Sequence, residues 1–350
     1  AFHFEGEPGD TRTITYSQML DDVSQAAHAL TELGIKSGDR VAIYLPMIPE
    51  AAVAMLACAR IGAVHSVVFG GFSADALLSR IQDADAKLVI TADGGFRKGS
   101  AFALKPAVDD ALKGKHNVAK VLVVKRTGEE TAWNSDRDIW WHEIVGRQSK
   151  SHTPEFFESE HPLFILYTSG TTGNPKGVLH GHRFLLGHLP CLELSFADFP
   201  NGADVGWTPA DWAWIGGLMD MAIPCFYFRV PLVAKRFERF TADAAFDLIR
   251  DAQITRAFLP PTALKMMRQA EVPASARLRS ISSGGEPLSA DLIEWAKAAL
   301  GAEVNELYGQ TECNLSAGSA RSWDVAQEGW IGQAFPGFDM RILDEWGRAV

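Results

Sequence analysis

Cysteine pairs, long apolar runs and excess positive charge are all missing from this 350-residue sequence. The four cysteines stand far apart without a CxxC pair, which disfavours a disulfide framework or a cysteine-based zinc site and favours a reducing cytoplasm. The longest apolar stretch, residues 51–59, is far shorter than the roughly 20 residues that span a bilayer, so no membrane span is predicted. A net charge of −10 disfavours nonspecific nucleic-acid binding, so any anionic ligand must be held by local groups.

A methionine start is also missing, as are the basic beginning and apolar middle of a signal peptide. We therefore expect the chain to be an interior piece of a longer protein, with any targeting information outside it. With 47% hydrophobic residues, a chain of 350 residues can bury a large core and would normally form two domains or subdomains.

Short β-like runs alternate with helical patterns along the chain, which predicts α/β layers with mainly parallel sheets. A helix is predicted to begin after Thr15, whose spacing to Gln18 fits a capping box, and to stop at Gly34. The predicted strands are 41–45, 64–69, 87–91, 120–124, 164–168, 255–259, 278–282 and 303–307.

The alternation fails between Arg126 and His161, where a polar segment is punctuated by tryptophans. Connections between compact parts of a chain have this character. We therefore predict two α/β subdomains, residues 1–160 and 161–350, that are joined by this segment.

Residues 167–177 read YTSGTTGNPKG and follow the apolar run 162–166. The three glycines let backbone amides turn inward, and the hydroxyls and a lysine add further donors, which suits a phosphate. The loop is not a Walker A motif, because that motif needs Gly-Lys followed by Ser or Thr, whereas Lys176 follows Pro175 and precedes Gly177. An ordinary Gly-rich surface turn is the alternative interpretation.

The stretch YTSGTTGNPKGVLHGH resembles the phosphate loop of the adenylate-forming superfamily, which includes acyl-CoA synthetases, luciferases and the adenylation domains of peptide synthetases. Residues 283–287 (SGGEP) resemble that family's adenine-side loop, and residues 308–312 (YGQTE) resemble its aromatic-x-x-Thr-Glu motif, in the family's order. The resemblance implies the large N-terminal domain of the adenylate-forming fold, with two layered α/β subdomains and mainly parallel sheets. The small C-terminal domain, which carries a lysine that assists adenylation, is expected to lie beyond Val350.

The resemblance also implies ATP and Mg²⁺ as ligands, in a reaction in which a carboxylate attacks the α-phosphate and pyrophosphate leaves. The β- and γ-phosphates would be held by Thr168, Ser169, Gly170, Thr171, Thr172, Gly173 and Lys176. The adenine side would be formed by Gly285, Glu286, Pro287, Tyr308, Gly309 and Gln310. Thr311 would donate to the α-phosphate and Glu312 would coordinate Mg²⁺. The predicted catalytic group is therefore Thr168, Lys176, Thr311 and Glu312.

Two stretches of the first half, FGGF at 69–72 and ADGGFRKG at 92–99, resemble acetyl-CoA synthetases, in which they lie along the CoA site. The resemblance implies that Gly71 lets the nucleotide approach the backbone and that Arg97 faces the 3′-phosphate of CoA. A charged surface turn is the alternative interpretation of Arg97.

The second half departs from acetyl-CoA synthetases at two positions of the acid pocket. Those enzymes have tryptophan and usually valine where this chain has Gly309 and Gly284, and WTPADWAWIGGL at 207–218 resembles medium-chain acyl-CoA synthetases. A packed aromatic core is the alternative for Trp212 and Trp214. The pocket is expected to be deep, with a lining of Trp214, Ile215, Gly216, Gly284 and Gly309.

His180 and His182 raise the question of a metal site, but no Asp, Glu or Cys stands nearby at a recognisable ligand spacing. Packing against a helix that starts near Phe184, or a contact to the phosphate loop, is the preferred interpretation.

The sequence therefore predicts an AMP-forming acyl-CoA synthetase, which converts a short- to medium-chain carboxylic acid, ATP and CoA to acyl-CoA, AMP and pyrophosphate. The alternatives are an acetate–CoA ligase, an adenylation domain that loads a carrier protein, and a nucleotide-binding module without turnover. The expected partners are small molecules alone, and the sequence leaves the oligomeric state open.

Overall fold

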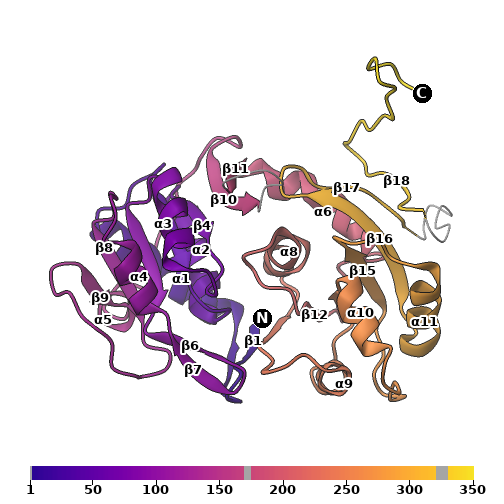
Figure 1. The fold of residues 1–350 in the computed structure, drawn as a ribbon, viewed down its shortest axis with the longest axis horizontal. Helices are drawn as coiled ribbons and strands as arrows, with labels where there is room; N and C mark the ends of the chain where they lie inside the picture. The colour runs from indigo at the N-terminus through magenta and orange to yellow at the C-terminus, as the bar shows by residue number, and fades with distance from the viewer. Residues whose placement is uncertain (1, 169–174, 321–329) are drawn as a thin grey trace. The chain divides into compact units, whose positions relative to one another are not determined.

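The computed structural model describes residues 2–168, 175–320 and 330–350, and the chain forms two compact units (Figure 1). Unit 1 consists of the residues up to Phe184 with two later segments, 211–214 and 234–239. Unit 2 consists of residues 185–210, 215–233 and 240–350. The subdomain boundary predicted after residue 160 stays a prediction.

Unit 1 is built on a seven-stranded sheet with the order β11-β10-β4-β3-β5-β8-β9. Its strands are β3 (Arg40–Tyr44), β4 (Val64–Val67), β5 (Leu88–Ala92), β8 (Lys120–Val124), β9 (Asp138–Trp140), β10 (Pro162–Thr168) and β11 (Lys176–Gly181). Neighbouring strands are parallel except for β10 with β11. Val41 and Ile43 on β3 and Ile90 on β5 are fully buried, as expected for parallel strands covered on both faces.

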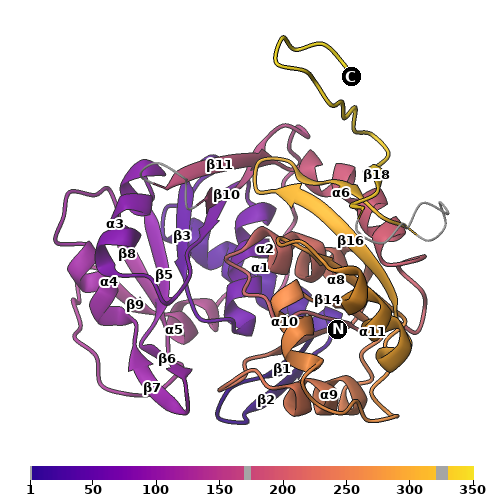
Figure 2. The same cartoon turned by 45° about the vertical axis from the view of Figure 1, so that its right-hand side comes forward.

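Helices cover both faces of this sheet. α1 (Tyr16–Glu32) packs with α2 (Pro49–Arg60) and α5 (Trp141–Val145), while α3 (Ala74–Asp83) packs with α4 (Lys105–Ala111). Figure 2 shows α3 and α4 on one side of β3, β5 and β8, with α1 and α2 on the other.

The capping box predicted at the start of α1 is confirmed. Gln18 N donates to Thr15 Oγ1 at 3.1 Å, and Thr15 N donates to Gln18 Oε1 at 2.8 Å. The helix ends at Glu32, just before Gly34, whose φ of +86° favours glycine.

The interpretation of residues 126–161 as a mere connection is wrong for part of that segment. β9 pairs in parallel with β8 and forms the edge of the unit 1 sheet, and α5 follows it directly. Asp138 on β9 is buried, and its Oδ2 lies 2.7 Å from the equally buried Lys105 Nζ. A three-residue strand that is stabilised by a buried ion pair has no alternating apolar pattern, so no periodicity in the sequence predicts it.

Two antiparallel hairpins complete unit 1. β1 (Phe2–Glu5) pairs with β2 (Thr11–Ile14), and β6 (Gly94–Arg97) pairs with β7 (Ser100–Ala103).

The strands of unit 2 follow the order β18-β17-β16-β15-β14-β12-β13. They are β12 (Gly206–Trp207), β13 (Leu232–Lys235, which crosses the unit boundary), β14 (Arg256–Phe258), β15 (Ser280–Gly284), β16 (Glu303–Gln310), β17 (Asn314–Gly318) and β18 (Gln333–Ala334). The strands from β13 to β16 run parallel, and β17 and β18 continue the sheet antiparallel.

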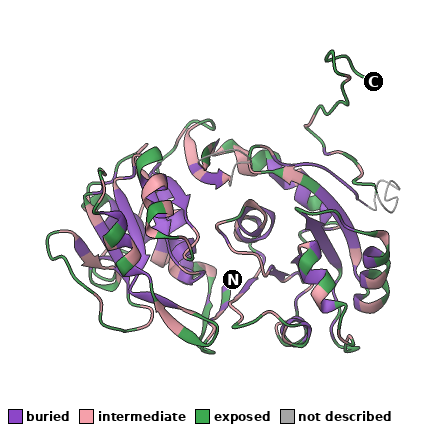
Figure 3. Ribbon diagram, viewed as in Figure 1, coloured by how far each residue is buried: buried purple, intermediate pink, exposed green. Residues whose placement is uncertain are grey.

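The helices after β11 are α6 (Arg183–Ser195), α7 (Ile215–Gly217), the π-helical turn η1 (Leu218–Ala222), α8 (Ile223–Phe228), α9 (Ala242–Asp251), α10 (Pro261–Met267) and α11 (Ala290–Leu300). All eight predicted strands are present, and the α/β class with mainly parallel sheets is confirmed. Figure 3 shows that the strands of both sheets are largely buried.

Within the described ranges, no helix has both the length and the apolar character that crossing a bilayer needs. The four cysteines are free thiols, and three of them are buried. Burial raises the pKa of Cys58 and of Cys191 to about 12, which makes both thiols poor nucleophiles.

Candidate functional site

The two strands that flank the predicted phosphate loop form an antiparallel hairpin in unit 1. Thr168 at the end of β10 pairs with Lys176 at the start of β11. Lys176 is exposed and Thr168 is partly buried, so the lysine is available to a ligand. The other predicted phosphate-loop residues, Ser169, Gly170, Thr171, Thr172 and Gly173, lie outside the described residues.

Partly buried polar contacts hold the loop end of β10. Tyr167 Oη donates to Asp83 Oδ2 at 2.7 Å, and the Arg80 guanidinium lies over the Tyr167 ring at 5.3 Å. Burial raises the pKa of Tyr167, and the neighbouring Asp83 carboxylate raises it further. A Cβ added at Gly177 would lie 3.1 Å from Tyr167 Cε1, so the glycine lets β11 pass close to this ring.

His180 and His182 extend from this hairpin into aromatic packing. The His180 ring lies 4.1 Å from the Phe184 ring, at the start of α6, and 4.9 Å from the Phe164 ring. The His182 ring lies 5.9 Å from the Phe157 ring, and burial lowers its pKa. The predicted packing of His180 against a helix start is confirmed. Among the residues that the structure describes, no group of three His, Cys, Asp or Glu side chains is arranged to hold a metal ion.

The predicted CoA-side residues of unit 1 lie on a loop and a hairpin. A Cβ added at Gly71 would lie 2.4 Å from Phe69 Cε1, so this position admits no side chain without movement of that ring. Arg97 is exposed and ends β6, next to the hairpin turn formed by Lys98 and Gly99. Their φ values of +56° and +77° make this a left-handed turn.

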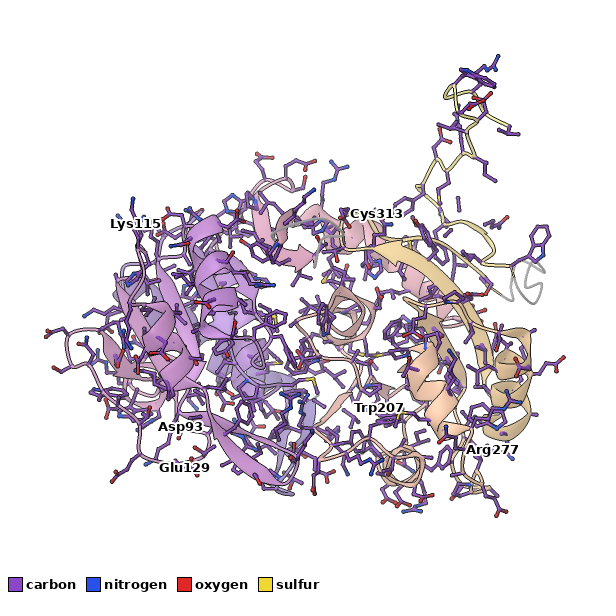
Figure 4. The ribbon with its side chains drawn as sticks, in the orientation of Figure 1. Asp93, Lys115, Glu129, Trp207, Arg277 and Cys313 are labelled. Atoms are coloured by element: carbon purple, nitrogen blue, oxygen red, sulfur yellow. The ribbon has the colours of Figure 1, made fainter. Side chains whose placement is uncertain are left out.

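Asp93 fixes the start of the Arg97 hairpin. Its buried carboxylate accepts hydrogen bonds from Gly94 N, Arg126 N and Gly128 N, each at 2.7 Å. Figure 4 labels this residue beside β6. The carboxylate thereby ties β6 to the loop that follows β8.

Acidic side chains lie at the tip of the same hairpin. Gly99 N donates to Glu7 Oε1 at 2.7 Å, and a Cβ at Gly99 would lie 2.8 Å from Glu238 Oε1. A phosphate bound by Arg97 would therefore meet local repulsion from these carboxylates, unless Lys98 offsets it. The role of Arg97 stays a prediction.

In unit 2, the predicted adenine-side loop leaves the end of β15 and is braced from two sides. Gly285 has a φ of +89°, a conformation that favours glycine. The Glu286 carboxylate accepts from Thr262 Oγ1 at 2.9 Å, and Leu288 N donates to Glu306 Oε1 at 3.1 Å. Pro287 lies between these two contacts and is exposed.

Glu306 on β16 has an unusual environment for a carboxyl group. It is buried, and this burial raises its pKa, while the hydrogen bond from Leu288 N opposes the shift.

The predicted aromatic-x-x-Thr-Glu motif forms the end of β16 and its turn into β17. Tyr308 is 39% exposed, which leaves part of its ring free for a ligand, and Gln310 Nε2 donates to Tyr308 Oη at 3.3 Å. Gln310 pairs with Asn314, so Thr311, Glu312 and Cys313 form the tip of the turn. Glu312 is exposed there, and Figure 4 labels the neighbouring Cys313.

The three glycines of the predicted acid pocket are all required by close packing. An added Cβ would lie 2.8 Å from Phe258 Cζ at Gly216, 2.7 Å from Leu307 O at Gly284, and 2.1 Å from Asn314 O at Gly309. Glycine at 284 and 309 therefore has a local backbone reason, beside any reason that a substrate supplies.

The tryptophans near this predicted pocket differ from one another. Trp212 is buried and packs against Phe2 with ring centroids 5.8 Å apart, so the core-packing alternative is confirmed for Trp212. Trp214 is 47% exposed and belongs to unit 1, whereas the half-buried Ile215 belongs to unit 2.

Sequence reasoning did not identify several polar residues that contact the predicted site segments: Arg80, Asp83, Asp93 and Glu306. One signal was detectable, an acidic residue directly after an apolar run, as for Asp93 after LVITA. That signal predicts burial with a partner but does not identify the partner.

Comparisons with known proteins agree with these motifs. The family of AMP-binding enzymes matches residues 1–350. The acetyl-coenzyme A synthetase of Streptomyces avermitilis is 46% identical over 367 aligned residues, which cover 100% of this chain and 55% of that protein. The acetyl-coenzyme A synthetase of Mycobacterium tuberculosis is 47% identical over 317 residues, covering 86% of this chain and 48% of that protein.

A solved structure is also similar, the crystal structure of Brucella canis acyl-CoA synthetase. It has a TM-score of 0.88 and 27% sequence identity, and the match covers 100% of this chain and 62% of that chain. The chain thus spans about half the length of the curated relatives it matches.

Proposed function

Because this chain belongs to the AMP-binding enzyme family, we propose that its protein is an AMP-forming acyl-CoA synthetase. In this reaction a carboxylic acid attacks the α-phosphate of ATP, pyrophosphate leaves, and the acyl group passes from AMP to the thiol of CoA. The observation that carries the proposal is the position of the three motifs, which begin in the last residues of β10, β15 and β16 and continue past the carboxyl ends of these strands. Ligands of α/β sheets bind at such ends.

The phosphate groups of ATP would be held at the β10–β11 hairpin. Lys176 supplies a positive charge to the outer phosphates and to the departing pyrophosphate, and Thr168 supplies a hydroxyl at the opposite strand end. Ser169, Gly170, Thr171, Thr172 and Gly173 complete this proposed loop by their backbone amides and hydroxyls.

The adenine would stack on the exposed part of Tyr308, beside the loop of Gly285, Glu286 and Pro287. Thr311 at the tip of the β16–β17 turn would donate to the α-phosphate, where negative charge increases as the acid attacks.

Mg²⁺ fits the same turn. The Glu312 carboxylate is exposed beside Thr311 and is a suitable oxygen ligand, and Mg²⁺ in nucleotide sites commonly needs only one or two carboxylates with water and phosphate. The ion would neutralise phosphate charge when bound.

CoA is proposed as the acyl acceptor on the strength of the first half of the chain. Gly71 and Arg97 are the residues assigned to it, with Arg97 directed at the 3′-phosphate. The free, scattered cysteines further support a cytoplasmic location for the protein.

The acid is proposed to be short- to medium-chain. The reason is that this chain has Gly309 where acetyl-CoA synthetases have the tryptophan that closes the bottom of the acid pocket. Acetate is the second candidate, favoured by the 46% identity to an acetyl-coenzyme A synthetase. Because the chain spans about half of such relatives, the substrates and the activity refer to the whole protein.

Hydroxylamine capture tests this function directly. The full-length protein is incubated with ATP, Mg²⁺, a carboxylic acid and hydroxylamine, which converts acyl-AMP to a hydroxamate. We expect hydroxamate that depends on both ATP and acid, and a thioester when CoA replaces hydroxylamine. Hydroxamate without any thioester from CoA would instead indicate a carrier-protein acceptor, and ATP binding without hydroxamate would indicate a binding module.

A further inference from the structure

The β10–β11 hairpin of unit 1 has two faces with different side chains at its loop end. Successive side chains of a strand point to opposite faces, so Tyr167 projects from the face opposite to Thr168. Lys176 pairs with Thr168 and shares its face. Tyr167 is 9% exposed, and a tyrosine hydroxyl that is buried usually has a hydrogen-bond partner. The partners of Tyr167 therefore show what holds the back of this hairpin.

The hydroxyl of Tyr167 is held by the last turn of α3. Tyr167 Oη donates to Asp83 Oδ2 at 2.7 Å and lies 3.3 Å from the carbonyl oxygen of Arg80. Burial raises the pKa of Tyr167, so the phenol keeps its proton and remains the donor. Asp83 is the last residue of α3, so both acceptors belong to a helix and not to a loop.

The ring of Tyr167 is held by the same helix from a second direction. The guanidinium carbon of Arg80 lies 5.3 Å from the centroid of the Tyr167 ring and 4.5 Å from that of the Phe72 ring. Arg80 Nη1 donates to the carbonyl oxygen of Ala76 at 2.7 Å, which fixes the guanidinium in turn. A cation over an aromatic ring is attracted to it. Tyr167 cannot move without disturbing contacts to α3.

The second strand of the hairpin passes directly beside this tyrosine–aspartate pair. Gly177 pairs with Tyr167. A Cβ added at Gly177 would lie 3.1 Å from Tyr167 Cε1 and 3.2 Å from Asp83 Oδ2. The backbone of β11 is therefore in contact with both side chains, and Lys176 is the next residue along that backbone.

We propose that Tyr167 and Asp83 are positioning residues, which anchor the loop end of the β10–β11 hairpin to α3 and so hold Lys176 in place for the outer phosphates of ATP. This inference rests on the proposed function, which assigns Lys176 to these phosphates. It adds the pair of side chains that fixes the strand from which the lysine extends. A donor stabilises developing charge best when its position is fixed in advance.

Small substitutions separate this role from general stability. Tyr167→Phe removes the hydroxyl and keeps the ring, so the contact with the Arg80 guanidinium remains. Asp83→Leu removes the acceptor at similar size, and Asp83→Asn keeps an acceptor oxygen. The matched control is Tyr227→Phe, a tyrosine on α8 of unit 2 that is 49% exposed.

The experiment measures binding of Mg²⁺–ATP and of AMP to the full-length protein by calorimetry. For Tyr167→Phe and Asp83→Leu we expect the Kd of Mg²⁺–ATP to rise about fivefold, the scale of one lost hydrogen bond. The Kd of AMP, which lacks the outer phosphates, should change by less than about twofold. Asp83→Asn should raise the Kd of Mg²⁺–ATP less than Asp83→Leu does, and the control should match wild type.

A double variant tests whether Tyr167 acts through Lys176. Residues that act as one unit have effects that do not add. In a Lys176→Ala background, Tyr167→Phe should therefore cause no further rise in the Kd of Mg²⁺–ATP, because the group that it positions is already absent.

Three results would overturn the proposal. Tyr167→Phe could bind both nucleotides as the control does, in which case the hydroxyl positions nothing. It could weaken Mg²⁺–ATP and AMP equally, which would indicate a structural role alone. It could also weaken Mg²⁺–ATP by the same factor with and without Lys176, which would show that it acts on another group.

The single variant Lys176→Ala separates these failures from a failure of the proposed function. If Lys176→Ala weakens Mg²⁺–ATP and AMP equally, the assignment of Lys176 to the outer phosphates is wrong, and the positioning role is wrong with it. If Lys176→Ala weakens Mg²⁺–ATP alone and Tyr167→Phe does not, only the positioning role fails.

Discussion

At the scale of single residues, the one charged side chain of the proposed phosphate loop, residues 167–177, is Lys176. Lys176 is exposed at the first position of β11. Its backbone pairs with Thr168, so the strand holds the Cα of this lysine in place while the side chain extends from it. This position suits a contact to the outer phosphates of ATP, which AMP lacks.

Lys176→Ala should therefore weaken the binding of ATP more than that of AMP. The expected difference is about 1.5 to 3 kcal/mol, the value of a hydrogen bond to a charged group. Calorimetry with both nucleotides measures it, and Lys115→Ala, an exposed lysine in the loop after α4, is the control. An equal loss for ATP and AMP would remove Lys176 from this role.

Glu306 provides a second test at this scale, through the pH dependence of stability. Burial holds its folded pKa above the ordinary value of a glutamate, so the folded protein binds this proton more tightly than the unfolded chain does. Its contribution to folding is therefore complete below its ordinary pKa and is lost as the pH rises through the folded pKa.

We expect Glu306→Gln to gain stability relative to wild type as the pH is raised from about 4 to about 7. Gln can still accept the hydrogen bond from Leu288 N. Urea unfolding at a series of pH values gives the difference, with the exposed Glu294→Gln on α11 as the control. If the free energy of unfolding changes with pH in the same way for Glu306→Gln and wild type, then the pKa of Glu306 is not raised by burial.

At the scale of secondary-structure elements, the β16–β17 hairpin depends on a close approach that only glycine permits. A Cβ at Gly309 would lie 2.1 Å from Asn314 O, which is backbone and cannot rotate away. Gly309→Ala should therefore destabilise unit 2 by about 1 to 3 kcal/mol, the usual result of overpacking.

The matched control for this prediction is Gly187→Ala on α6. A Cβ there meets no atom within 4 Å, so alanine should stabilise the helix by about 0.5 to 1 kcal/mol. Thermal unfolding measures both variants, and we expect a lower melting temperature for Gly309→Ala and a higher one for Gly187→Ala. If Gly309→Ala leaves the stability unchanged, then the β16–β17 hairpin can shift enough to accept a side chain at this position.

Most strands of the two sheet interiors could be predicted, because β3, β5, β8 and β15 are apolar runs bounded by turn residues. Among the strands that the sequence did not predict are β9, β12, β13 and β17. β9 has three residues and is held by a buried ion pair of Asp138, and β17 comes directly after the predicted aromatic-x-x-Thr-Glu motif.

The residues of the motifs could also be predicted from the sequence, whereas the residues that contact these motifs in the folded chain could not. Thr311 and Glu312 stand in a recognisable motif, but the hydrogen bond of Thr262 with Glu286 joins residues that are far apart in the sequence. The same limit applies to Gly309: the sequence suggested an open pocket, and only the hairpin geometry adds a backbone reason for the glycine. A substitution such as Gly309→Trp would for that reason disturb the β16–β17 hairpin as well as the predicted pocket.

At the scale of the whole molecule, the chain-length preference for the acid is the most informative property. Each methylene buried in an apolar pocket contributes about 0.8 kcal/mol. Extending acetate to hexanoate therefore offers about 3 kcal/mol, or on the order of a hundredfold in kcat/KM, if the pocket admits the chain. We expect the full-length protein to prefer acids of about four carbons or more. A preference for acetate over hexanoate would favour the acetate–CoA ligase alternative.

The central claim is that the protein activates a carboxylic acid by forming an acyl-adenylate with release of pyrophosphate. Acid-dependent exchange of labelled pyrophosphate into ATP measures this step in reverse and needs no CoA. We expect the full-length protein to catalyse the exchange when Mg²⁺ and a carboxylic acid are both present, and we expect Lys176→Ala to slow it. If the exchange is absent, or is the same without any carboxylic acid, the protein does not form an acyl-adenylate.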